Sequence, residues 1–285
     1  MADLKNTIIA DVGSINLPSG TTAQRPSAPP AGATRFNTDL GYTECYFRGF
    51  WFDLTTGAGA LTGGESLVYL LDASIPESTN GTTGFRWKSI GPVAGRDFDF
   101  YGTPQYVSNG LSSYWRFDES NHATCENLCA TNYSSVECVF RRYANNPEDI
   151  LLNKESTWEI KTDSATLQWA WYGTDRSWYW SNSGSIVDNN IYHVMITYSG
   201  NEVTSYVNGR RRQIDTAYDN GVHGNQTTAY PKINARGAAR DARDNPGSHD
   251  IFMTALYDRP LNDFEVYSNY TACAKRFNIP FNAYN

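Results

Sequence analysis

The segment 191–211 constrains the fold of this chain more than any other stretch. Along Ile191–Tyr198, successive side chains are expected to point to opposite sides of a strand, and the residues of one side are aromatic or β-branched. Val203–Val207 repeats this composition. Period-two alternation predicts strands, and the short connection containing Gly200 predicts a hairpin. Asn208-Gly209 accepts positive φ at both positions, which suits a type I′ turn and predicts a third strand after it. Because one hairpin is marginal in water, a second sheet must cover its apolar face.

Similar patterns recur at short intervals through the C-terminal two-thirds of the chain, at 114–119, 133–141, 158–161, 166–172 and 250–257. The chain carries 8 Trp, 19 Tyr, 13 Phe and 23 Gly, which suits short strands and many turns. We therefore predict an all-β fold, in which two antiparallel sheets pack face to face as a sandwich. A loop is expected over 181–190. One helix is expected after Pro260, with Asn262 as N-cap and Glu265 as its capping partner.

Three regions are predicted along the chain. Residues 1–60 form an arm and a small β element for attachment or oligomerisation, with strands at 33–37, 42–47 and 50–54. Residues 61–104 form a linker or intermediate β region, which follows a Gly- and Thr-rich stretch at 55–64. Residues 105–285 form the sandwich.

The N-terminal region contains a recognisable run of residues. Gln24-Arg25-Pro26, Arg35-Phe36-Asn37-Thr38-Asp39 and Trp51 stand in an order that resembles a small β element of bacteriophage tail-fibre and other virion proteins. The resemblance implies attachment to other virion proteins and a homo-oligomer, with a trimer favoured. It gives that role to six residues, namely Arg25, Pro26, Arg35, Phe36, Asn37 and Trp51. A proline-rich linker followed by a simple meander is the alternative interpretation.

The C-terminal region resembles a second family over about 105–272. The matching residues include Tyr114–Glu119, Tyr192-His193-Val194, Tyr206-Val207-Asn208-Gly209 and Leu256–Leu261, followed by Glu265. This pattern is similar to the laminin-G-like, concanavalin A-like jelly roll, which implies a jelly-roll β-sandwich. The same fold serves binding, catalysis and pure structure, so function has to be argued from the site.

Catalytic residues are not evident in the sequence. A glycoside hydrolase on this scaffold needs two carboxylates beside the scissile bond, and the hydrolase branch of the superfamily usually carries Glu-x-Asp-x-x-Glu on one strand. No such run is present, and Asp97-Phe98-Asp99 and Glu148-Asp149 are isolated. His193 lies on a predicted strand, where a structural histidine is commoner than a catalytic base. We therefore expect a protein that is not an enzyme, with no catalytic residues and no cofactor.

A cluster of aromatic residues provides the candidate carbohydrate-binding site, because rings can stack on sugar C–H faces. Alternation places Trp169 and Trp171 with Leu167 in the core. The residues that border the next loop are better candidates, namely Tyr172, Asp175, Trp178 and Tyr179. Contact with the core or with another subunit is the alternative role for these side chains. Calcium binding through Asp118, Asp175 and Asp219 is left open, but no dense acidic loop predicts a metal site.

Charge and cysteine content exclude several classes of partner. A net charge of −7 leaves no basic surface for nucleic acid, and no stretch approaches the roughly 18 apolar residues of a membrane span. The N-terminus shows no secretory signal. Five cysteines without such a signal predict free thiols, although a bridge from Cys125 or Cys129 to Cys138 is left open. Cys125 and Cys129 lack a second pair that would complete a zinc set.

Together these observations favour a non-enzymatic structural protein of a virion, of the fibre, appendage or capsid-decoration type. It would be made in the host cytoplasm and exposed on the particle surface, with its N-terminus as anchor and its jelly roll directed outward. A host-surface glycan is the expected additional partner. The alternatives are a carbohydrate-binding adhesin that is not primarily structural and, less favoured, a glycanase.

Overall fold

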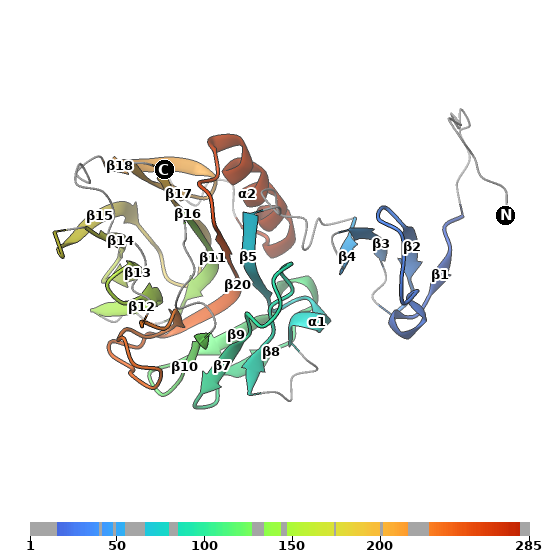
Figure 1. Ribbon diagram of the computed structural model, residues 1–285, viewed down its shortest axis with the longest axis horizontal. Helices are drawn as coiled ribbons and strands as arrows, with labels where there is room; N and C mark the ends of the chain where they lie inside the picture. Colours follow the sequence, from blue (N-terminus) through green and yellow to red (C-terminus); the bar gives the residue numbers. More distant parts are fainter. Residues whose placement is uncertain are drawn as a thin grey trace. The chain divides into compact units, whose positions relative to one another are not determined.

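The computed structural model describes residues 16–39, 42–47, 50–54, 66–79, 85–126, 134–143, 147–173, 175–199, 202–215 and 228–279. The chain divides into two compact units, Met1–Thr55 and Thr56–Asn285, which are described separately below (Figure 1).

The first unit is a small four-stranded sheet with strand order β1-β2-β3-β4. The three strands predicted at 33–37, 42–47 and 50–54 are confirmed as β2, β3 and β4, which pair antiparallel. The two-residue β1 runs parallel to β2. A short 3₁₀ helix, η1, precedes β2. The bounds are β1 Ser19–Gly20, η1 Thr22–Gln24, β2 Thr34–Asn37, β3 Tyr42–Phe47 and β4 Phe50–Asp53.

The described interior of this first unit is ionic rather than apolar. Glu44 has no exposed surface, and it accepts hydrogen bonds from Arg25 Nη2 at 2.7 Å and Asn37 Nδ2 at 3.0 Å. Arg35 Nε lies 3.5 Å from the same carboxylate, and both guanidinium groups lie 6.0 Å from the Trp51 ring. A buried carboxylate is tolerated only when it is paired and hydrogen-bonded in this way.

The second unit is a sandwich of two eight-stranded sheets, as the all-β prediction requires (Figure 1). We call the sheet with order β15-β14-β13-β12-β19-β10-β7-β6 the front sheet. The sheet with order β18-β17-β16-β11-β20-β9-β8, in which β5 also pairs with β20, is the back sheet. The bounds are β5 Leu67–Asp72, α1 Pro76–Thr79, β6 Arg86–Trp87, β7 Phe98–Tyr101, β8 Gln105–Val107, η4 Gly110–Ser112, β9 Tyr114–Phe117, β10 His122–Thr124, β11 Ser135–Arg142, β12 Glu148–Lys154, β13 Trp158–Asp163, β14 Thr166–Tyr172, β15 Trp178–Ser185, β16 Ile191–Ser199, β17 Glu202–Val207, β18 Arg210–Asp215, β19 Lys232–Ile233, β20 His249–Tyr257 and α2 Asp263–Phe277.

The strands β5, β6 and β7 belong to these two sheets, so the sandwich begins well before residue 105. Strand β5 is buried along its whole length and pairs with β20 over Leu67–Asp72. The Gly- and Thr-rich stretch at 55–64 lies outside the described residues.

The apolar side chains form two clusters, one on each side of the back sheet. Between the sheets lie Trp87, Trp115, Trp158, Trp169 and Trp171, and the alternating residues of β16 join them, as predicted. The second cluster contains Met195, which points the other way, and the buried face of α2. The back sheet is therefore buried on both faces, whereas the apolar clusters formed by the described residues lie on only one face of the front sheet.

Local signals in the sequence explain several boundaries. Asn208 and Gly209 have φ values of 50° and 70°, and β18 follows them as the predicted third strand. The Asn262 side chain accepts hydrogen bonds from the amides of Phe264 and Glu265, which confirms the predicted helix start. The loop expected over 181–190 is wrong in its first half, because β15 continues to Ser185 and pairs with β14. An edge strand exposed on one face does not need the apolar alternation that the prediction relied on.

Candidate functional site

The middle of the front sheet's outer face is closed by an ion network. Arg236, which follows β19, approaches Glu148 on β12 at 2.9 Å and Glu159 on β13 with Nε–Oε2 at 2.7 Å. Lys161 Nζ lies 2.5 Å from the same Glu148. The segment after β19 also forms a bridge between Pro246 and Ile150 of β12. The 236–246 segment therefore covers this part of the sheet.

Two carboxylates with diverging pKa values lie in this network. Burial raises the pKa of Glu159, even though Arg236 opposes the shift. Burial acts in the same direction on Glu148, but hydrogen bonds from Lys161 and Arg236 outweigh it and lower the pKa of that carboxyl. Acid–base pairs in enzymes show such a divergence. However, Glu159 is 1 % exposed and its carboxylate is bonded to the guanidinium group, so a substrate cannot reach it.

The outer face carries aromatic side chains at β14 and β15, at the edge of the front sheet. Because Trp171 and Trp169 point into the core, Tyr172, Trp178 and Trp180 point outward. The Trp178 and Trp180 rings stack with centroids 6.0 Å apart and planes 30° apart, and Tyr172 meets Trp178 edge-on at 5.2 Å. We call these three residues the aromatic edge.

The aromatic edge presents an apolar ring to solvent over a partly buried ion pair. Trp180 is 41 % exposed, and Lys161 Nζ, which is buried and bonded to Glu148, lies 4.1 Å from its ring centroid. An exposed indole ring that stacks on a second, partly buried one can hold a flat ligand that has C–H groups.

The four candidates chosen from the sequence are thus divided between two sides of the sheet. Tyr172 and Trp178 belong to the aromatic edge, but Tyr179 packs against the sandwich core and donates a hydrogen bond to Asp175 Oδ2 at 2.6 Å. That bond lowers the pKa of Asp175 and raises the pKa of Tyr179. Asp175 also accepts from the Ser177 amide, so the pair shapes the β14–β15 connection. Trp180 was not selected, although its spacing of two from Trp178 was the signal that could have identified it.

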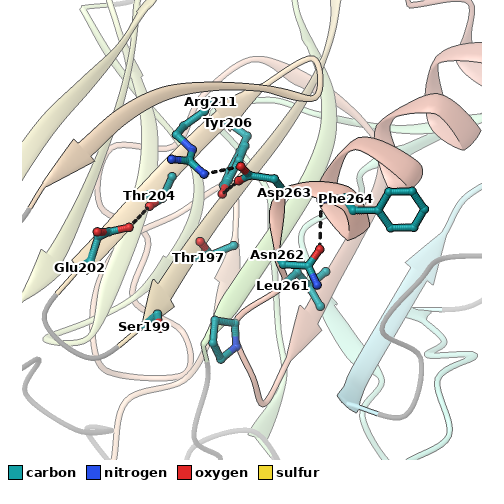
Figure 2. A pocket seen from close by; sticks show the side chains of 11 residues that line it. Thr197, Ser199, Glu202, Thr204, Tyr206, Arg211, Leu261, Asn262, Asp263 and Phe264 are labelled. Carbon is teal, nitrogen blue, oxygen red and sulfur yellow. Dashed lines mark hydrogen bonds and ion pairs between the residues drawn. The ribbon is translucent and has the colours of Figure 1, made fainter.

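A concave groove lies where the back sheet meets the start of α2. This groove has a volume of about 440 Å³, and Figure 2 shows side chains from β16, β17, β18 and the α2 N-terminus around it. Asp263 accepts a hydrogen bond from Tyr206 Oη at 2.7 Å and another from Arg211. Phe264 is 75 % exposed beside it. The lining residues are Thr197, Ser199, Glu202, Thr204, Tyr206, Arg211, Pro260, Leu261, Asn262, Asp263 and Phe264.

The polar groups of this groove are mostly bonded to one another. Arg211 pairs with Asp263, Thr204 Oγ1 donates to Glu202 at 3.0 Å, and the Asn262 side chain caps α2. A ligand would have to displace these bonds. The groove is therefore a weaker candidate for a binding site than the aromatic edge, where the Trp180 ring is exposed.

The residues considered for calcium are not gathered at one site. Asp118 Oδ1 accepts hydrogen bonds from Ser120 and Asn121 in its own turn, Asp175 bonds to Tyr179, and Asp219 lies outside the described residues. Asp118 follows β9 of the back sheet and Asp175 follows β14 of the front sheet, so the two carboxylates belong to different sheets.

The described cysteines and helices test the expectations about disulfide bridges and membrane spans. Among the described residues Cys45, Cys138 and Cys273 are free thiols, so no bridge joins Cys125 to Cys138, while Cys129 lies outside the described residues. In the part of the chain that the structure describes, no helix has the length and apolar character needed to span a membrane.

The six residues proposed for attachment lie in the first unit and have two kinds of environment. Arg25, Arg35 and Asn37 bind Glu44 inside the unit, with Trp51 beside the two guanidinium groups. Pro26 and Phe36 are exposed, and Phe36 is 37 % exposed. Of the six, these two are the residues most available for contact with another chain.

The two face-to-face sheets and the strand order define a concanavalin A-like jelly roll. A laminin-G family model, described as the concanavalin A-like lectin/glucanases superfamily, matches residues 117–267. This match spans just over half of the 285 residues, and the chain belongs to this superfamily. A search among curated proteins found no match.

Solved structures with the same fold include binding domains of bacterial toxins. The chain is similar to HCR/D-Sa-GBL1/C, with 12 % identity and a TM-score of 0.57 over 74 % of this chain and 53 % of that one. It is also similar to the binding domain of Paraclostridial Mosquitocidal Protein 1, with 15 % identity and a TM-score of 0.55 over 73 % and 52 %. The binding domain of botulinum neurotoxin DC gives 12 % identity and a TM-score of 0.56 over 74 % and 52 %.

This chain thus spans about half the length of these structures, and at such identities the similarity establishes the fold alone. The family match lies inside the sandwich. The resemblance of the N-terminal run to phage virion proteins stays a prediction.

Proposed function

We propose that this protein is a non-catalytic adhesin of a virion, whose jelly roll binds carbohydrate at the aromatic edge and whose N-terminal unit attaches it to the particle. The observation that carries the binding function is the stacked pair Trp178 and Trp180 at the edge of the front sheet, of which Trp180 is 41 % exposed.

The chemistry of the aromatic edge suits a sugar. Pyranose rings present C–H faces that pack on indole rings, and their hydroxyl groups need polar partners around the rings. Gln168 and Asn182, paired across β14 and β15, supply two amide groups beside the rings. Among the similar structures, the botulinum neurotoxin DC domain was solved in complex with SialylT, which shows that a jelly-roll relative of this kind occurs in a ligand-binding protein.

A glycanase is disfavoured by the ion network in the middle of the front sheet. The pair Glu148 and Glu159 has the residue types that hydrolysis needs, but Arg236 occupies the space between the two carboxylates. Incubation of the purified protein with host polysaccharide should release no reducing sugar. Release that is lost in Glu159→Gln would replace the adhesin proposal with a glycanase.

The attachment role rests on the N-terminal resemblance and on the separate unit that contains it. We expect that deletion of residues 1–55 prevents incorporation into particles, because the attachment residues are lost. The deleted protein should keep its glycan binding, because the aromatic edge belongs to the other unit. Normal incorporation of the shortened protein would refute the anchoring role and would leave the binding role intact.

A glycan array tests the binding role directly. The wild-type protein, Trp178→Ala and Trp180→Ala should be compared at equal concentration, with Phe264→Ala as the matched control. That control removes an exposed ring beside the back-sheet groove instead of the front sheet. The proposed site is supported if both tryptophan variants lose a specific signal and Phe264→Ala keeps it. Loss in Phe264→Ala alone would move the site to the groove, and absence of any signal in the wild type would refute carbohydrate binding.

A further inference from the structure

A compact polar cluster is buried between the back sheet and α2. Glu137 on β11 and His193 on β16 have no exposed surface, and Cys273 on α2 is 2 % exposed. One donor atom from each residue lies within 4.8 Å of the other two. Tyr257 on β20 and Asn269 on α2 complete the cluster. The glycan-binding function proposed above does not use these residues.

The hydrogen bonds inside the cluster leave one buried carboxylate without a lysine or arginine partner among the described residues. Glu137 Oε1 lies 2.7 Å from His193 Nε2, and Glu137 Oε2 accepts from Tyr257 Oη at 2.7 Å and from Asn269 Nδ2 at 3.1 Å. The imidazole nitrogen that faces the carboxylate is therefore Nε2. A carboxylate with no exposed surface is costly unless a positive charge pairs with it. This second observation indicates that the cluster suits a cation.

We propose that Glu137, His193 and Cys273 form a structural zinc site that fastens α2 to the back sheet. A carboxylate oxygen, an imidazole nitrogen and a thiolate sulfur are the three donor types that zinc takes in proteins. On binding, the thiol releases its proton to solvent as the sulfur–zinc bond forms, while the neutral imidazole donates a lone pair. The two anionic ligands then balance the charge of the ion, so that no net charge is buried.

The surrounding residues fit the role of an outer shell. Tyr257 and Asn269 already donate to Glu137, and such donors orient a ligating carboxylate. Without a cation, burial raises the pKa of the Cys273 thiol well above its usual value, so the sulfur stays protonated and inert. An ion in the cluster would join two neighbouring strands to the helix that covers them. Because the ligands are buried, the ion must enter during folding, and native protein should exchange it slowly.

Cobalt substitution tests the site with a signal that does not depend on glycan binding. The full-length protein is unfolded in denaturant with a chelator and a reductant, freed of both, and refolded with cobalt(II). We expect one equivalent of bound cobalt and a near-ultraviolet thiolate-to-cobalt absorption band. Cys273→Ser should lose the band, and the control Cys138→Ser should keep it, because Cys138 is equally buried but lies between the two sheets.

Several results would overturn the proposal. One is a wild-type protein that refolds but binds no cobalt or shows no absorption band. Another is a Cys273→Ser variant whose band is as strong as that of the wild type. If Cys273→Ser does not refold, the wild type alone remains decisive. Its urea midpoint should be higher after refolding with one equivalent of zinc than after refolding with chelator, and equal midpoints would refute a structural ion.

Discussion

Replacement of Gly209 by alanine should destabilise the jelly roll strongly, and the structure allows the size to be worked out. Gly209 lies in the turn between β17 and β18 with φ of 70°, beneath Tyr270 of α2. A Cβ atom there would lie 2.4 Å from Tyr270 Cδ1, 2.7 Å from Cγ and 2.9 Å from Cβ. These are atoms at the base of the tyrosine side chain, so a simple rotation of the ring cannot relieve the clash and the helix has to move.

Two costs add at this position. Left-handed backbone costs an L residue about 1–2 kcal/mol, and overpacking of a filled interior costs about 1–3 kcal/mol. We therefore expect Gly209→Ala to lower the free energy of unfolding by about 2–5 kcal/mol, a large part of the stability of an ordinary domain. Equilibrium unfolding in urea, followed by tryptophan fluorescence, measures this difference directly.

Gly110→Ala provides the matched control. Gly110 also has positive φ, 56°, but a Cβ atom there would meet nothing within 4 Å. It should cost only the backbone part, about 1–2 kcal/mol. In a double-mutant cycle, Tyr270→Ala should recover part of the loss in Gly209→Ala, because it removes the clash. Equal losses in Gly209→Ala and Gly110→Ala would refute the packing argument.

Three further changes test the ion network, a buried histidine and the helix cap. Arg236→Ala leaves Glu159 buried without its cation and should cost about 3–5 kcal/mol in urea unfolding, whereas Arg240→Ala, which breaks a partly exposed pair with Asp99, should cost about 0–1 kcal/mol. Burial lowers the pKa of His122 from 6.5 to about 4, so the unfolded chain takes up the proton first and stability falls as the pH drops below about 6.5. From pH 7.5 to 5.5 wild type should therefore lose about 1 kcal/mol more than His122→Asn, and equal losses would contradict this. Asn262→Ala should cost about 1 kcal/mol through two lost cap bonds. At the melting midpoint of the wild type, the variant should therefore show less helical signal than the wild type.

Short-range patterns in the sequence were sufficient for much of the jelly roll. The alternation in Ile191–Tyr198, the Asn208-Gly209 turn and the Asn262 cap are each determined by residues a few positions apart, and the structure confirms all three. The resemblance to laminin-G-like proteins added the arrangement of the strands, which no local pattern contains.

The features that the sequence did not reveal depend on residues far apart in the chain or on exposed strands. Trp180 was not selected because the candidates were chosen at the border of the preceding loop, whereas Trp180 lies further along the edge strand β15. Arg236 lies in a charged segment that resembles a solvated loop, yet its partner Glu159 is buried on another strand. His193 and Glu137 are 56 residues apart, so only the pairing of β16 with β11 brings them together.

The position of the aromatic edge follows from what covers the other faces of the sandwich. Helix α2 closes the outer face of the back sheet, and the segment around Arg236 closes the middle of the front sheet. On the outer face of β14 and β15, three aromatic side chains gather instead of the charged residues that usually protect an edge strand, and Trp180 is 41 % exposed. Exposed edge aromatics favour aggregation unless a ligand or a partner uses them. Gln168 and Asn182 pair beside these rings, and their amide groups oppose dry packing against another subunit and favour a hydrated ligand such as a sugar.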